Sequence, residues 1–264
     1  MIYGILVDVT KCIACEKCVE ACSLQLEVDP QKALREKATN RDGLSAYRRS
    51  NIVKIEEGRF ARKSCMHCLE PSCVSACLVG GITKAPNGPV VYDPDKCIGC
   101  RYCMLACPFQ VPRYEWDKTS PLMVKCDLCA DRVNDGKEPA CVEACSEGAL
   151  IFGERDKLLE EAGRRINETP TRYINHIWGE KEFGGTSVMY VSDVDLNLIG
   201  WPETAAVSIP SLTEPLVHTT PIIGMSVAAG LVGLNWIVKR RNKIAREGNS
   251  GEKDLQNQEN VKDE

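Results

Sequence analysis

One stretch of the chain carries four cysteines whose spacing is suited to binding iron. Two residues separate Cys97 from Cys100 and Cys100 from Cys103. Three residues separate Cys103 from Cys107, and Pro108 follows directly. This spacing is typical of loops that hold iron–sulfur clusters through cysteine thiolates, with three sulfurs on one cubane and the fourth reaching a second cluster. A structural zinc site is the alternative, but zinc ribbons use separated Cys-x2-Cys pairs.

All sixteen cysteines of the chain fall into four such sets. The sets are Cys12, Cys15, Cys18 and Cys22; Cys65, Cys68, Cys73 and Cys77; Cys97, Cys100, Cys103 and Cys107; and Cys126, Cys129, Cys141 and Cys145. Disulfides are the usual interpretation of many cysteines, but sets of four without an odd cysteine suit four 4Fe–4S clusters. Because metal binding couples to folding, we expect the cluster-free chain to be largely unfolded.

The sets repeat along the chain. Residues 8–15 align with residues 93–100, and residues 70–77 align with residues 138–145, so sets one and three are copies, as are sets two and four. Between sets two and three, residues 81–93 contain two β-prone runs around an Asn-Gly turn, which predicts a hairpin. We therefore expect one contiguous ferredoxin-like module from sets two and three, and a second, split module from sets one and four.

The fourth cysteine of each set is expected to cross to the other set of its module. The predicted ligand groups are Cys12, Cys15, Cys18 and Cys145; Cys22, Cys126, Cys129 and Cys141; Cys65, Cys68, Cys73 and Cys107; and Cys77, Cys97, Cys100 and Cys103.

Local patterns predict the elements around these sets. We expect strands at residues 2–9, 148–153 and 188–191, a hairpin at residues 51–58, and an amphipathic helix at residues 155–167. The first two strands are free to pair with each other, and Asp156 is a possible helix cap. Residues 170–215 show no recognisable chemistry, and residues 184–187 are interpreted as a turn because they lack a phosphate-loop pattern.

The C-terminal part predicts a membrane helix. Residues 221–238 are eighteen residues without a charge, close to the length that spans a bilayer. Residues 239–246 contain five Lys and Arg, whereas residues 201–220 contain none, so the C-terminus is expected to be cytoplasmic and the cluster domain to face outward. We expect a single-pass protein of the inner membrane, exported with a signal-bearing partner because residues 1–8 lack a signal-peptide pattern.

These patterns define the expected organisation. The fold class is α+β, with a four-cluster double ferredoxin-like domain at residues 1–154, a helix and partner-contact segment at 155–218, a transmembrane helix at 219–240 and a disordered tail at 241–264. The net charge of −4, from 33 basic and 37 acidic residues, gives no indication of nucleic-acid binding.

The cysteine sets, the stretch at residues 126–132, the segment at residues 179–186 and the single apolar helix together carry a family resemblance. The chain resembles the four-cluster iron–sulfur subunits of membrane-bound respiratory oxidoreductases, such as the formate dehydrogenase beta subunit and the hydrogenase-2 electron-transfer subunit. This resemblance implies a relay without a catalytic site of its own. Electrons would pass between a catalytic subunit, of molybdenum/tungsten-pterin or nickel–iron type, and a cytochrome b or quinone-reactive membrane subunit. A polyferredoxin on the cytoplasmic membrane face and a zinc-stabilised interaction module are the alternatives.

Overall fold

The computed structural model describes residues 1–28, 42–199 and 206–260. Parts of the predicted 155–218 segment and of the 241–264 tail therefore lie outside the described residues. The chain divides into two compact units, Met1–Leu212 and Thr213–Glu264, and each is described by itself.

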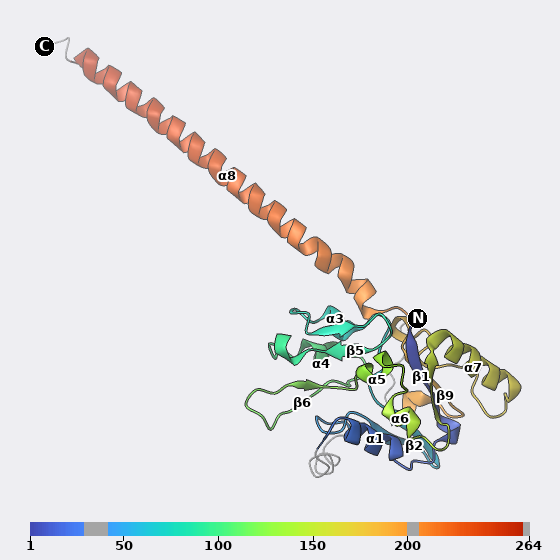
Figure 1. Ribbon diagram of the computed structural model, residues 1–264. Coiled ribbons are helices and arrows are strands. Elements are labelled where there is room, and N and C mark those ends of the chain that lie inside the picture. The colour runs from blue at the N-terminus through green and yellow to red at the C-terminus, as the bar shows by residue number, and fades with distance from the viewer. Residues whose placement is uncertain (29–41, 200–205, 261–264) are drawn as a thin grey trace. The chain divides into compact units, whose positions relative to one another are not determined.

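A three-stranded sheet forms the centre of the first unit (Figure 1). Strand β1 (Tyr3–Asp8) pairs antiparallel with β8 (Leu150–Glu154), which confirms the predicted pairing of the first two strands. Strand β9 (Val188–Val191) lies on the other edge of β1 and runs parallel to it. Part of the segment expected to follow the cluster domain is thus the third strand of its central sheet.

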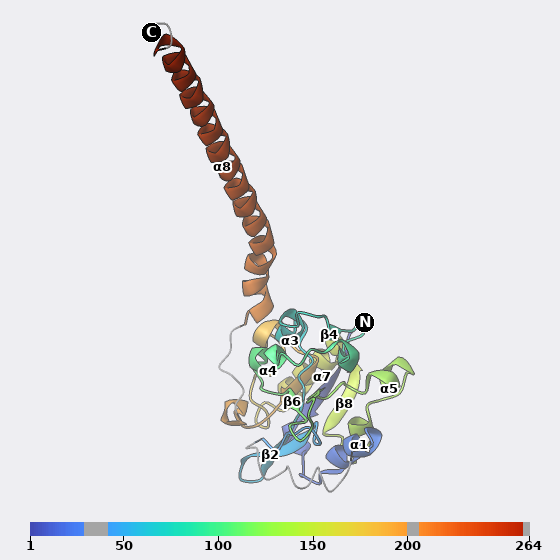
Figure 2. The same cartoon turned by 90° about the vertical axis from the view of Figure 1, so that its left-hand side faces the viewer.

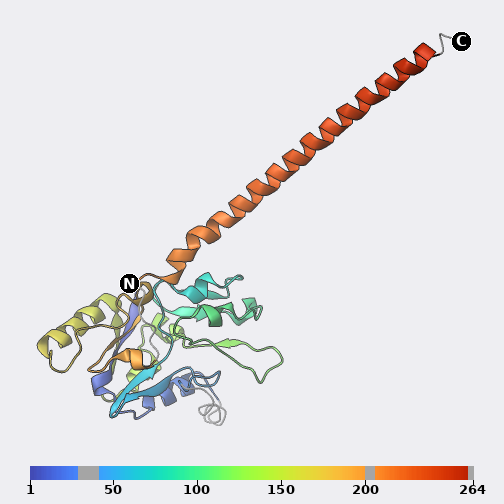
Figure 3. The ribbon, with the colours of Figure 1, turned by 180° about the vertical axis from the view of Figure 1, so that it is seen from behind.

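Helix α7 (Arg155–Glu168) packs on the sheet and confirms the predicted amphipathic helix (Figure 3). Its residues Leu158, Ala162 and Ile166 are buried in one cluster with Leu6 and Met189 of the sheet. The spacing of three and four residues places these side chains on one face of the helix.

The predicted cap of α7 is wrong. Glu154 occupies the N-cap position without a side-chain hydrogen bond, and Asp156 lies inside the first turn. A carboxylate in the first turn still interacts favourably with the helix dipole. The helix itself was predicted from the spacing of its apolar residues, which does not depend on the cap.

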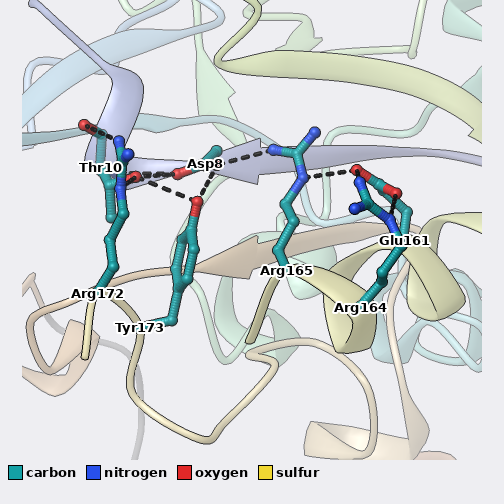
Figure 4. Close-up of polar contacts among 7 residues, drawn as sticks. All are labelled: Asp8, Thr10, Glu161, Arg164, Arg165, Arg172 and Tyr173. Carbon is teal, nitrogen blue, oxygen red and sulfur yellow. Dashed lines mark hydrogen bonds and ion pairs between the residues drawn. The ribbon is translucent and has the colours of Figure 1, made fainter. Parts of the chain in front are cut away.

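A buried carboxylate at the end of β1 ties this strand to α7 (Figure 4). The Asp8 side chain is fully buried and accepts hydrogen bonds from Thr10, from the Tyr173 hydroxyl at 2.9 Å and from Arg165 Nη1 at 2.7 Å. Arg165 Nε also donates to Glu161, and hydrogen bonds from Arg164 and Arg165 lower the pKa of Glu161 to about 2. Cys12 begins the first cysteine set four residues after Asp8, so this network fixes the strand end that leads into it.

Three two-stranded hairpins make up the other sheets among the described residues. They are β2 (Asn51–Glu56) with β3 (Arg59–Lys63), β4 (Ile82–Lys84) with β5 (Val90–Tyr92), and β6 (Arg113–Tyr114) with β7 (Met123–Val124). The first two confirm predictions. The third was not predicted, because strands of two residues leave almost no periodic signal.

The β4–β5 turn also contacts the central sheet. The Tyr3 backbone N–H donates to the Asn87 carbonyl at 2.9 Å. Gly88 has φ +119°, and a Cβ there would lie 2.5 Å from the Tyr3 carbonyl oxygen. Only glycine fits this close approach, so the hairpin turn joins the middle of the chain to its N-terminal strand.

Five short helices accompany the cysteine sets, and four of them pack in two pairs. They are α1 (Lys17–Gln25), α3 (Ser72–Ser75), α4 (Tyr102–Ala106), α5 (Ala130–Asn134) and α6 (Ala140–Glu143). Helix α1 of set one packs on α6 of set four, and α3 of set two packs on α4 of set three (Figures 1 and 2). The pairing therefore follows the repeat, with sets one and four together and sets two and three together.

The second unit consists mainly of the long helix α8 (Ile209–Asn260). The first four residues of this helix are assigned to the first unit, which ends at Leu212. Among the described residues, the part of α8 from Ile209 to Ile244 is long and apolar enough to cross a membrane, and its apolar window of eighteen residues has a mean hydropathy of 1.7. It contains the predicted apolar stretch and extends beyond it at both ends. The side chains of Ile222, Leu231 and Trp236 are exposed.

Substituting Arg165 with Met should destabilise the first unit, because Arg165 is the one cation among the described residues that pairs with the fully buried Asp8 carboxylate. We expect the free energy of unfolding to fall by about 3 kcal/mol. The matched control is Arg164→Met, whose partners Glu161 and Glu168 lie at the helix surface and which should cost about 0.5 kcal/mol. Anaerobic thermal denaturation measures both, and equal shifts in Tm would contradict the role given to Asp8.

Candidate metal centres

The cysteine loops of sets one and three have the same backbone geometry. Ala14 and Glu16 have φ +58°, and Gly99 and Arg101 have φ +70° and +65°. Each loop follows a single 3-10 turn, Val9–Lys11 or Pro94–Lys96, whose preceding aspartate accepts a backbone N–H. The repeat seen in the sequence is therefore also a repeat of local structure.

Left-handed residues also stand in sets two and four, at His67 with φ +48° and at Leu128 with φ +60°. This backbone conformation turns the chain back on itself, so that N–H groups point to the preceding sulfur. The Gly99 N–H donates to Cys97 Sγ and the Leu128 N–H donates to Cys126 Sγ, both at 3.4 Å. Such bonds favour the thiolate form and tune the potential of a cluster bound to it.

One cavity gathers cysteines from sets one and four. It is lined by Cys12, Cys15, Cys18 and Cys145, with Val7, Ile52 and Leu150 among its apolar walls. Cys145 is far from the others in sequence and reaches them because β8 pairs with β1. These four cysteines are one of the groups expected from the repeat.

A second cavity gathers another expected group. Cys77, Cys97, Cys100 and Cys103 line it together with Ile82 and Tyr114. The sulfur of Cys103 lies 3.2 Å from the Tyr114 hydroxyl. Cys77 belongs to set two, and the packing of α3 on α4 brings it close to the cysteines of set three.

The two remaining groups are buried more deeply. The Cys68 sulfur interacts electrostatically with the sulfurs of Cys65, Cys107 and Cys73. In the same way, Cys22 interacts with Cys126 and Cys141. Cys129 also interacts with this pair. The structure thus brings together the members of all four groups, whereas their assignment as cluster ligands stays a prediction.

Burial controls the protonation of these thiols. It raises the pKa of Cys18 to about 11, and burial together with the nearby Cys126 sulfur raises the pKa of Cys22 to about 12. Burial likewise raises the pKa of Cys73 to about 12. Iron binds the thiolate, so it must displace a proton from each of these sulfurs.

The cysteine environment fits cubane clusters. Each group offers four sulfurs from two segments, apolar walls and backbone N–H donors, which are the features that bind and tune such clusters. A single zinc ion would hold its sulfurs at about 2.3 Å. Among the described residues, no group of three or more His, Cys, Asp or Glu side chains is arranged to hold one metal ion.

A loop that the sequence pattern treated as a plain turn supports the second cysteine set. Thr186 and Ser187 are fully buried, the Ser187 N–H donates to the Met66 carbonyl, and the Leu69 N–H donates to the Gly185 carbonyl. Glu182 is also buried and accepts a hydrogen bond from the Gly179 N–H at 2.7 Å. The residues 179–188 therefore hold the Cys65–Cys68 loop against β9, a role that no local pattern could have indicated.

Comparison with known proteins agrees with this chemistry. Residues 57–155 match the 4Fe-4S dicluster domain family. A protein of Nitratidesulfovibrio vulgaris (strain Hildenborough) is 40% identical over 93% of this chain and 69% of its own length. The hydrogenase-2 operon protein HybA of Escherichia coli O157:H7 is 35% identical over 91% of this chain and 85% of its own length.

A further relative is the iron-sulfur subunit of the nitrate-inducible formate dehydrogenase of Escherichia coli K12. It is 34% identical over 70% of this chain and 66% of its own length. The fold and the cysteine groups thus define an iron–sulfur protein of the 4Fe–4S dicluster class. Within that class, the chain belongs to the family of HybA, and it is related to the formate dehydrogenase iron-sulfur subunits.

Proposed function

We propose that this chain is an electron-transfer subunit that carries four 4Fe–4S clusters, one in each cysteine group. The observation that carries the proposal is that Cys12, Cys15, Cys18 and Cys145 line one cavity and Cys77, Cys97, Cys100 and Cys103 line another, each group drawn from two sets of the repeat. When bound, the clusters would supply one-electron chemistry. The residues of this chain would hold the thiolates, donate N–H groups to sulfur and exclude water.

The architecture supports two modules of the predicted kind. Helices α3 and α4 join sets two and three in the contiguous module, and α1 and α6 join sets one and four in the split module. The β1–β8 pairing closes the split module. The two modules would place four clusters within one small unit, as a relay requires.

We infer the partners from the relatives. A HybA-like chain would pass electrons between a catalytic subunit of nickel–iron or molybdenum/tungsten-pterin type and a membrane cytochrome b or quinone-reactive subunit. The proposal assigns no catalytic site to this chain, because its conspicuous side-chain groups are thiols suited to holding clusters.

We also propose that α8 anchors the chain in the inner membrane through residues 221–238. The apolar stretch ends at Val238, two residues after Trp236. Three basic residues follow directly, namely Lys239, Arg240 and Arg241. The Arg240 guanidinium lies 5.3 Å from the Trp236 ring centroid, a pairing suited to the interface between lipid and water. Because the positive flank is expected to stay inside, the C-terminus would be cytoplasmic and the cluster unit would face outward.

Cysteine substitutions in pairs test the ligand groups. Cys145→Ser should remove about four irons, and the double variant Cys12→Ser, Cys145→Ser should lose no more, because both cysteines belong to one cubane. The matched double variant Cys129→Ser, Cys145→Ser should lose about eight irons, because its cysteines belong to different cubanes. Iron analysis of anaerobically purified protein measures the losses, and the reverse pattern would show that each set holds its own cluster.

Mild-detergent purification of the tagged chain tests the partners. We expect a large catalytic subunit and a polytopic membrane subunit to co-purify, identified by mass spectrometry. The control is the chain truncated after residue 208, which lacks α8 and should lose the membrane subunit. A full-length chain that purifies alone, with its clusters intact, would favour the polyferredoxin alternative.

Protease treatment of intact spheroplasts tests the orientation. An epitope at the N-terminus should be cleaved while an epitope at the C-terminus is protected, since the basic flank at 239–246 keeps that end inside. A cytoplasmic marker protein controls for lysis. Protection of the N-terminal epitope would place the cluster unit on the cytoplasmic face.

A further inference from the structure

Arg62 is a fully buried cation in the first unit. It lies on β3 opposite Ile52 of β2, and its side chain is among the largest that are fully buried. Its own carbonyl accepts a hydrogen bond from the Tyr190 hydroxyl at 2.7 Å. Arg62 thus belongs to the β2–β3 hairpin, and a hydrogen bond to its backbone connects it to the central sheet.

The guanidinium of Arg62 lacks an ordinary counter-ion. Nη1 donates to Ser64 Oγ at 2.7 Å, whereas Nε is buried without a hydrogen-bond partner. Within the described ranges, no carboxylate lies at ion-pair distance from it, in contrast to Arg48 with Glu16 and Arg165 with Asp8. A buried cation is unfavourable unless negative charge compensates it, so another source of negative charge is needed.

Cysteine thiolates from two different groups would supply this negative charge once they bind clusters. Arg62 lines the cavity of Cys12, Cys15, Cys18 and Cys145. It also interacts electrostatically with Cys141, Cys126 and Cys22 of the neighbouring group. Burial alone would lower the pKa of Arg62, but these sulfurs raise it above its ordinary value.

We propose that Arg62 is a shared counter-ion for the two clusters of the split module, and that its charge raises the reduction potential of both. The inference rests on the proposed function, because it needs a cluster in each of these two cysteine groups. A cubane with four thiolates is anionic, and reduction adds a further electron to it. A positive charge held inside a low-dielectric core therefore favours the reduced form of each cluster it faces.

The position of Arg62 also makes its effect on the two clusters similar. One charge that faces both raises both potentials, so it makes the split module easier to reduce and changes the difference between the two potentials little. Arg62 is a positioning and tuning residue in this scheme, and it does not carry the electron itself.

The test compares Arg62→Gln, which removes the charge and keeps much of the shape, with Arg62→Lys, which retains the charge. Anaerobic redox titration monitored by EPR gives the four potentials. For Arg62→Gln we expect two of them to fall by the equivalent of about a tenfold change in the reduction equilibrium, or about 59 mV for one electron. The other two should not move, and Arg62→Lys should restore most of the shift.

The matched control is Arg59→Gln. Arg59 lies on the same strand β3 as Arg62, but its guanidinium has an ordinary counter-ion, because Nε donates to Asp193 at 2.6 Å. This control should shift none of the four potentials. A shift of one potential only, of all four equally, or of none in Arg62→Gln would overturn the inference.

Iron analysis separates this inference from the proposed function. Wild-type protein with about sixteen irons per chain and no selective shift would remove the role of Arg62 and leave the relay standing. Protein without iron would end both.

A measurement on the unaltered chain covers the case in which Arg62→Gln loses its clusters. With ¹⁵N-labelled arginine, pulsed EPR should detect nitrogen coupling to both reduced clusters of the split module, and Arg62→Lys should abolish it. Absence of the coupling from either cluster in the wild type would overturn the inference.

Discussion

The first unit has to position sixteen thiols although most of its helices and strands are short. Helices α3 and α6 have four residues each, and the β6 and β7 strands have two. Elements this short are not stable in isolation. Metal–sulfur bonds would supply cross-links between segments that a small apolar core cannot provide. Each predicted cysteine group would join the two sets of one module in this way.

Polar groups at buried positions serve the same arrangement. Asp8 fixes the end of β1 where the first cysteine set begins, and Thr186 and Ser187 hold the loop of the second set. Each of these polar side chains is fully buried and hydrogen-bonded. Arg62 differs from them, since its Nε has no hydrogen-bond partner and its electrostatic neighbours are sulfurs. Its unbalanced charge is consistent with a unit built to contain anionic clusters.

Local patterns predicted the elements that are long or strongly marked. The Ile-, Leu- and Val-rich first strand, the Asn87–Gly88 turn and the spacing of Leu158, Ala162 and Ile166 each appear in the structure where the sequence placed them. The Asp156 cap was wrong because several residues near a helix start can fill that position. The β6–β7 hairpin was missed because its strands are too short to show a period.

The sequence by itself determined the four cysteine sets and their repeat, and the motif spacing predicts which sulfur of each set crosses to the other set of its module. The tertiary structure decided what surrounds them. The parallel pairing of β9 with β1, the burial of the 184–187 loop and the position of Arg62 between two cysteine groups arise from contacts between residues far apart in the chain. Such contacts depend on packing, which local residue patterns do not encode.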